Sequence, residues 1–371
     1  MSFNRIGKNQ QVGELVLKTI STTAIMSTLL VTSASLSYAA DAIVVAEPEP
    51  AEYVRVCDTY GVGFFYIPGT EHCLRISGFV QYDVAAGELL GRTSLDKKTG
   101  LEKNETYYSR ARFALQADAR SETDLGTLRG YTEIWFDHRS TNVPPYSGKE
   151  HYYEMKQAFM DLGGWRAGYT HSLYKTMTLH AGRVIQEELV PFGPRSTNLI
   201  SYTYEAGNGF TAAVSLEHGD GLVHTIDSYL PHMVAGAAFQ QKWGSIRGVV
   251  GYDSNYEEWA GKIRVDLQPT DSIALWAMVG YGTDDHIANS VYKPWGGNWA
   301  AWGGGSARLS SKLGANIALG YDENENFALV ANVLYNVTPG FYIQPEISYK
   351  DNFKTSNSDS MGGWLRFRRS F

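Results

Sequence analysis

The sequence predicts an all-β fold, a transmembrane 16-stranded antiparallel β-barrel with short periplasmic turns and long external loops. Three observations lead to this fold class. Apolar and polar side chains alternate with a period of two from Leu74 to the end of the chain. The gaps between the predicted strands alternate between short and long. Outside the N-terminal 39 residues, no stretch is long and apolar enough for a membrane-spanning helix.

The composition of the 371 residues fits such a barrel. Aromatic residues make up 13% of the chain, and 38 residues are Gly. Gly suits tight turns and Tyr and Trp form interfacial belts, so this composition favours a membrane barrel over a helical protein. The net charge of −7 argues against a nucleic-acid-binding protein, which would carry a basic face. No nucleic-acid partner is therefore expected.

Residues 1–39 are predicted to be a signal peptide. Basic residues precede a short apolar stretch at residues 24–31, and Ser37-Tyr38-Ala39 matches the small-x-small cleavage pattern. We expect cleavage before Ala40 and export to the cell outer membrane of a Gram-negative bacterium. The alternative is an uncleaved N-terminal membrane anchor, but the apolar stretch is short and the segment is rich in Ser and Thr.

Residues 40–73 differ from the rest and are predicted to form an N-terminal periplasmic segment. The Glu-Pro-Glu-Pro run within residues 41–50 favours extended backbone. Cys57 and Cys73 are the only cysteines of the chain, and two cysteines in an exported protein usually form a disulfide. A metal site would need more ligands than this pair offers. We therefore predict a structural Cys57–Cys73 bond, no metal and no cofactor.

Residues 74–371 are assigned to the barrel because one face of each predicted strand is apolar and the other polar. In residues 244–253, for example, Ile246 and Val250 alternate with Arg247 and Asp253. The sixteen predicted strands lie near residues 74–83, 108–120, 126–138, 151–162, 164–173, 197–205, 209–217, 231–241, 244–253, 257–267, 272–281, 298–310, 314–321, 326–337, 341–350 and 361–371.

The lengths of the gaps separate the two ends of the barrel. Short gaps follow the even-numbered strands, and most gaps after odd-numbered strands are longer and more polar, as at 84–107 and 174–196. Outer-membrane barrels have short turns on the periplasmic rim and long loops outside, whereas a soluble sandwich has no reason to sort its loops this way. The last strand ends on Phe371, and a terminal aromatic residue is the usual barrel-terminal signal of bacterial outer-membrane proteins.

Three segments resemble the alphaproteobacterial general porin family. They are residues 53–78 (YVRVCDTYGVGFFYIPGTEHCLRISG), 40–44 (ADAIV) and 121–128 (SETDLGTL). The resemblance implies a homotrimer of 16-stranded barrels in outer-membrane lipids, each barrel with its own water-filled pore. It also implies a third long loop that folds inward and narrows the channel. The function implied is passive diffusion of small hydrophilic solutes and ions, filtered by size and charge.

The alternation predicts which basic side chains face the lumen. In a closed barrel the last strand pairs with the first, so basic residues on the first three strands and the last one converge on one wall. The predicted wall residues are Arg75, Arg110, Arg112, Arg129, Arg366 and Arg368. The alternative for any single one of them is an ordinary solvated lumen residue in a wide vestibule.

The predicted third loop, residues 174–196, carries Glu187 and Glu188 ahead of a Pro-aromatic-Gly turn at 191–193. This resembles the inward-folded loop of general porins. A basic wall opposite an acidic loop would produce a transverse field at the narrowest point, which favours hydrophilic solutes over apolar ones. The loop also contains Lys175, Arg183 and Arg195, so the sequence leaves the sign of ion selectivity open.

Two other functions use the same fold. An outer-membrane barrel enzyme needs a Ser/His or Asp/His set at its rim, and no such set can be assembled from this sequence, so no catalytic residue and no enzyme is predicted. A surface adhesin or receptor that uses the barrel as an anchor would favour loops much longer than the longest gap, 84–107.

Overall fold

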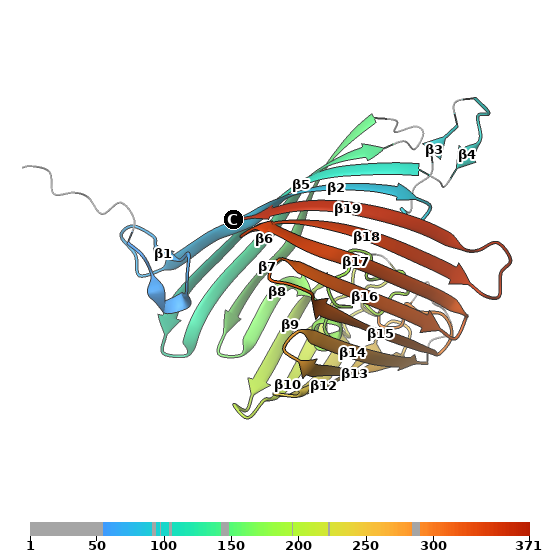
Figure 1. Ribbon diagram of the computed structural model, residues 1–371. Helices are drawn as coiled ribbons and strands as arrows, with labels where there is room; N and C mark the ends of the chain where they lie inside the picture. The colour runs from blue at the N-terminus through green and yellow to red at the C-terminus, as the bar shows by residue number, and fades with distance from the viewer. Residues whose placement is uncertain are drawn as a thin grey trace, which may run out of the picture. The chain divides into compact units, whose positions relative to one another are not determined.

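The computed structural model describes residues 55–90, 94–96, 98–103, 106–141, 148–194, 196–221, 223–283 and 290–371. The predicted signal peptide (1–39), its cleavage site and residues 40–54 lie outside this range, as does Arg195. The described residues form one large antiparallel sheet that closes on itself and a separate two-stranded sheet (Figure 1). No helix in the described ranges is long and apolar enough to cross a membrane.

Sixteen of the described strands form the barrel wall. In chain order they are β2 (Cys73–Gly87), β5 (Thr106–Thr123), β6 (Gly126–Thr141), β7 (Gly148–Leu162), β8 (Trp165–His171), β9 (Ser196–Glu205), β10 (Phe210–Glu217), β11 (His232–Gln241), β12 (Gly244–Asp253), β13 (Glu258–Thr270), β14 (Ile273–Gly282), β15 (Trp299–Arg308), β16 (Leu313–Asp322), β17 (Asn326–Thr338), β18 (Phe341–Asn352) and β19 (Ser360–Ser370). Each predicted strand range overlaps one of these strands, so the predicted number and order are confirmed.

Five short elements lie outside this wall. β1 (Phe65–Tyr66) pairs with β2, and β3 (Ser94–Leu95) pairs with β4 (Glu102–Lys103) in the first long loop. The 3-10 helix η1 (Asp58–Tyr60) precedes β1, and the one-turn helix α1 (Leu173–Thr176) follows β8.

The barrel closes where the last strand meets the first. β19 pairs antiparallel with β2, which places Arg366 opposite Asp83 and Arg368 opposite Gln81. Every other strand pairs with its neighbours in sequence order, including β9 with β10. A closed ring leaves no strand edge unpaired, as a wall surrounded by lipid requires.

The two faces of the wall differ as the alternation predicts. In β2, Val80 and Tyr82 point outward and are 53% and 44% exposed, whereas Gln81 and Asp83 point inward and are 2% and 0% exposed. Large apolar residues continue around the outer surface on most strands, among them Ile263 on β13. This outer surface is suited to the hydrocarbon region, and the polar inner surface to water.

The N-terminal segment packs at the start of β2. Cys57 and Cys73 form the predicted disulfide, with their Cα atoms 6.0 Å apart. Phe64 is buried between this bond and Tyr60 and Tyr66. The segment that leads into the first barrel strand is thus closed into a small loop by the Cys57–Cys73 disulfide.

Phe371 lies at the seam of the barrel, the line along which the last strand, β19, pairs with the first strand, β2. Its backbone N–H donates to the Gly78 carbonyl at 3.0 Å, and the Gly78 N–H donates back to the Phe371 carbonyl at 3.1 Å. Its ring stacks on the outward-facing Phe113 of β5, with ring centroids 6.3 Å apart. The final aromatic residue therefore extends the β19–β2 pairing and covers it on the outer side.

Candidate pore constriction

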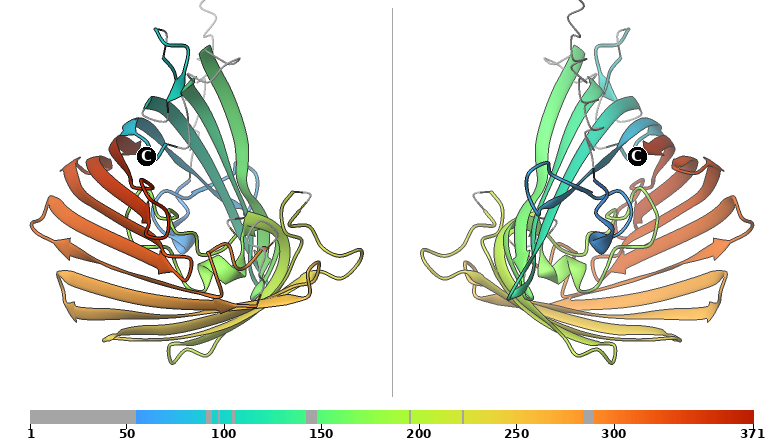
Figure 2. Two further views of the ribbon diagram at one scale, coloured as in Figure 1. Left: turned by 90° about the vertical axis from the view of Figure 1, so that its right-hand side faces the viewer. Right: turned by 90° about the vertical axis from the view of Figure 1, so that its left-hand side faces the viewer.

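The connection between β8 and β9 is here called loop L3, and its described residues, 172–194, run inside the barrel (Figure 2). Its apolar residues Tyr174, Val190 and Phe192 pack with inward-facing side chains such as Trp276 and Trp302. The predicted inward folding of this loop is confirmed. These aromatic lumen residues form the apolar surface against which the loop packs.

A buried carboxylate holds the beginning of loop L3. Glu217, at the end of β10, accepts hydrogen bonds from the Ser172 hydroxyl at 2.7 Å and the Leu173 backbone N–H at 2.9 Å. The Tyr292 hydroxyl donates to the same carboxylate at 3.0 Å. The Ser172 hydroxyl also accepts from the Tyr174 N–H and so caps α1. Three donors on one carboxylate fix the direction in which the loop leaves the wall.

A second carboxylate holds the middle of the loop on the far side of the barrel. Glu346 on β18 accepts from the backbone N–H groups of Ile185 at 2.5 Å and Gln186 at 2.8 Å. The Arg183 carbonyl accepts from the Asn332 side chain at 3.0 Å and the Gln344 side chain at 2.8 Å. Loop L3 therefore crosses the lumen from β10 to β18.

The returning half of the loop is held by two further donors. The indole Nε1 of Trp302 donates to the Val190 carbonyl at 3.0 Å. The ammonium group of Lys262, which is fully buried, donates to the Phe192 carbonyl at 2.7 Å and lies over the Tyr174 ring. Main-chain groups on both halves of loop L3 are bonded to the wall, so the loop is held in one position across the lumen.

The predicted loop carboxylates lie together and share a cation from the same loop. Lys175 Nζ is 3.3 Å from the Glu187 carboxylate and also contacts Glu188. His180 Nδ1 lies 3.1 Å from Glu187. Burial alone would raise the pKa of Glu187, but the His180 hydrogen bond and the Lys175 charge outweigh it and hold the pKa at about 2.

Four of the predicted wall arginines form one group near the middle of the seam. Asp83 accepts from Arg110 Nε at 3.2 Å and from Arg366 Nε at 2.8 Å. Arg112 binds Asp137 with both Nε and Nη2, at 2.6 and 2.7 Å. These residues, together with Arg139 on Asp137 and Arg368 over the ring of Phe79, are the upper arginine group: Arg110, Arg112, Arg139, Arg366 and Arg368. Four of its five guanidinium groups bind the two carboxylates, and the fifth, that of Arg368, lies over the Phe79 ring.

The remaining two, Arg75 and Arg129, lie elsewhere. Both contact Asp118, at 3.4 and 3.0 Å, and Arg75 stacks over Phe64 of the N-terminal segment at 4.7 Å. Arg75 is eight residues before Asp83 on the same strand, or about 26 Å along it. The six predicted wall arginines therefore separate into two groups at different heights.

The carboxylates that organise these groups were not among the residues predicted from the sequence. Asp83, Asp118 and Asp137 share the inward face with the arginines, and Glu346 shares it on β18. The alternation could have identified them, because each carboxylate is separated by an even number of residues from an inward-facing side chain on its own strand. In the described part of the chain, no three His, Cys, Asp or Glu side chains gather to hold a metal ion.

Comparison with known proteins identifies the relatives of this barrel. The family model described as "Porin subfamily" matches residues 41–367. Porin Omp2a of Brucella melitensis is 41% identical over 363 residues, which cover 91% of this chain and 96% of the relative. Porin Omp2b of Brucella neotomae is 41% identical over 360 residues, with the same coverage.

Solved structures with the same fold are more distant in sequence. The outer membrane channel DcaP of Acinetobacter baumannii aligns with a TM-score of 0.65 at 16% identity, over 82% of this chain and 99% of that one. A mutant of the Rh. blastica porin aligns with a TM-score of 0.55 at 13% identity, over 80% of this chain and all of the other. These two similarities show that the barrel architecture is shared.

Proposed function

From the premise that the chain belongs to the porin subfamily, we propose how its channel selects solutes. The protein is an outer-membrane porin, a channel for passive diffusion, and not an enzyme. We place the constriction between loop L3 and the upper arginine group. Arg75 and Arg129 are then charges of the periplasmic vestibule, below the narrowest point.

One relationship carries this proposal. Gln344 binds the Arg183 carbonyl of loop L3, and in the sheet Gln344 lies directly opposite Arg366. Arg366 in turn lies opposite Asp83, which lies opposite Arg110. Loop and arginines are therefore attached to the same row of residues across four neighbouring strands. A hydrated solute that passes the edge of the loop must pass these guanidinium groups.

The two sides of this gap carry different kinds of charged group. The upper arginine group has more guanidinium groups than carboxylates, whereas loop L3 contributes the carboxylates of Glu187 and Glu188. Fixed charges of opposite sign orient water across the gap, and a solute that cannot replace those water interactions pays for their loss. The channel is thus expected to admit small hydrophilic solutes and ions.

Conductance across a planar bilayer tests the function. Purified protein should give stable, ohmic current steps in KCl, and sugars above a limiting size should fail to reduce the conductance when added to the bath. A folded barrel that inserts but carries no current would refute both the channel and the constriction.

We also propose that three copies associate in outer-membrane lipids, each barrel with its own pore. The support is the family resemblance together with the apolar outer surface, which on β5 and β6 carries the stacked rings of Phe113 and Phe136. Native mass spectrometry of the detergent-solubilised protein should give the mass of three chains. A monomer under mild detergent conditions would count against the trimer.

The order of segments along the chain completes the proposal. Residues 1–39 direct export and are removed, 40–73 form a periplasmic segment, and 74–371 form the barrel. The intact mass of outer-membrane material should correspond to a chain that begins at Ala40 and contains the Cys57–Cys73 bond. A retained N-terminus would instead favour the membrane anchor.

A further inference from the structure

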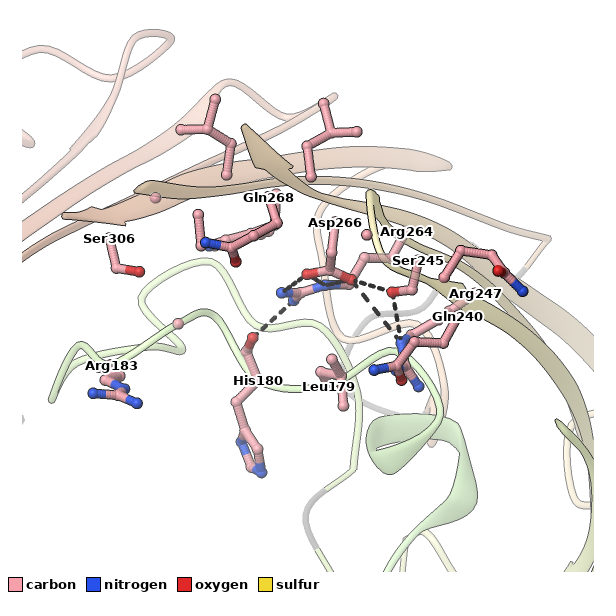
Figure 3. Close-up of a pocket in the computed structure, with 18 of the residues that line it drawn as sticks. Leu179, His180, Arg183, Gln240, Ser245, Arg247, Arg264, Asp266, Gln268 and Ser306 are labelled. Carbon is pink, nitrogen blue, oxygen red and sulfur yellow. Dashed lines mark hydrogen bonds and ion pairs between the residues drawn. The ribbon is translucent and has the colours of Figure 1, made fainter. Parts of the chain in front are cut away.

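A second feature of the lumen lies beneath loop L3 and is separate from the gap beside the upper arginine group. It is a pocket of about 570 Å³ between residues 179–183 of the loop and the ends of β11 to β15 that carry the short turns (Figure 3). The side chains that define its charge are Arg183, Lys242, Arg247, Arg264 and Asp266.

One ion pair in the pocket, Arg264 with Asp266, balances its own charge. Arg264 donates from Nε and Nη2 to Asp266, at 2.9 and 2.7 Å, and from Nη1 to the His180 carbonyl at 2.8 Å. Each of the three guanidinium nitrogens is therefore hydrogen-bonded, and the charge is balanced by Asp266. The pair supports the underside of the loop and adds no net charge to the pocket.

Three other cations in the pocket have no such balance. Arg247 donates to two neutral groups, Ser245 Oγ at 3.1 Å and Gln240 Oε1 at 3.0 Å, and is 4.0 Å from the carboxylate that Arg264 already occupies. Within the described ranges, the guanidinium of Arg183 and the ammonium of Lys242 contact no carboxylate. The pocket therefore has an excess of positive charge.

The unbalanced charges are presented from two separate elements. Arg183 projects from the loop, and Arg247 lies on the wall across the pocket from it (Figure 3). The pocket is also lined by Ser306 and by Trp276, which is 8% exposed and whose indole N–H has no acceptor among the described residues. An anion with one charged group can approach one cation at a time, whereas an anion with several can engage both elements at once.

We propose that this pocket, as part of the porin channel described above, binds small multivalent anions such as citrate during their passage. A bound anion bridges Arg183 and Arg247 and takes hydrogen bonds from the neutral donors around them. The pocket lies in the lumen on the short-turn side of loop L3, so an occupant places negative charge and bulk in the vestibule that ions cross after the gap. Binding is weak and reversible because the site stays in contact with water.

The test uses purified protein in planar bilayers at constant ionic strength, with citrate added in steps. Citrate should reduce the KCl current saturably and give an apparent binding constant. Arg183→Gln and Arg247→Gln should each lower that constant by about fivefold, which corresponds to roughly 1 kcal/mol. Arg247→Lys, which keeps the charge, should lower it less.

The matched control is Arg166→Gln, which removes a lumen guanidinium outside the pocket. Its binding constant should equal that of the unaltered protein. Equal losses in this control, or unchanged constants in both pocket variants, would overturn the proposal. Absence of KCl current would instead refute the channel, and calorimetric titration of citrate into the detergent-solubilised protein would then still decide whether the pocket binds anions.

Discussion

Arg366 on the last barrel strand donates to Asp83 on the first barrel strand at 2.8 Å, so an ion pair joins these two strands where the barrel closes. Asp83 is wholly buried and also binds Arg110 of the next strand. The same carboxylate thus links three strands and holds two of the guanidinium groups that we assign to the constriction.

Replacing Asp83 by Ala should destabilise the barrel. The change leaves Arg110 and Arg366 without their shared carboxylate, and breaking a buried ion pair in this way costs about 3 kcal/mol. Urea unfolding in detergent, followed by tryptophan fluorescence, measures the loss. Asp124→Ala in an exposed turn is the control and should be close to neutral. A similar unfolding midpoint for both variants would show that the seam does not depend on Asp83.

Charge reversal at the constriction should change ion selectivity in opposite ways on its two sides. Arg110→Glu should raise the cation/anion permeability ratio, and Glu188→Lys should lower it, because each replaces one sign of fixed charge by the other. The reversal potential in a tenfold KCl gradient should move by a measurable part of the ideal limit of roughly 59 mV. Unchanged reversal potentials in folded, conducting variants would remove these residues from the constriction.

Releasing the middle of loop L3 should widen the channel. Glu346→Ala removes the acceptor of the Ile185 and Gln186 N–H groups. The loop then keeps only the Gln344 bond to the Arg183 carbonyl among its bonds to β18 described above, while the strand pairing is unaffected. We expect higher conductance and a larger sugar-exclusion limit. Glu205→Ala, on an exposed strand end, serves as the control. If Glu346→Ala keeps the original exclusion limit, other bonds suffice to hold the loop.

The loop charge should resist acid. The pKa of Glu187 is lowered from the ordinary 4.5 to about 2, so its ionised form stabilises the folded loop above pH 4.5. That contribution is lost only as the pH falls through the interval from 4.5 to about 2. Selectivity measured from pH 7 to pH 4 should therefore change little through Glu187.

Removing the partners of this carboxylate provides the comparison. In Lys175→Met with His180→Ala, burial is no longer outweighed, and the pKa of Glu187 should rise to or above its ordinary value. Selectivity should then begin to change near pH 5. Coinciding pH profiles for this variant and the unaltered protein would contradict the role of Lys175 and His180.

The sequence alone determined the strands, which face of each strand is polar, and the disulfide that precedes the barrel. A period of two specifies which side of the wall each residue occupies, so the prediction for Arg110, Arg112, Arg366 and Arg368 needed only the alternation along their strands. Two cysteines in an exported chain leave one pairing, and the Cys57–Cys73 bond followed from that.

Only the tertiary structure decided height, partners and the path of loop L3. Alternation says nothing about how far along the barrel axis two residues lie, and strand register and tilt separate Arg75 and Arg129 from the upper arginine group. The loop bends toward β18 because Glu346, 161 residues beyond Ile185, offers its carboxylate there. Such a bond depends on which strands face each other across the closed ring, and no local pattern in the sequence contains that information.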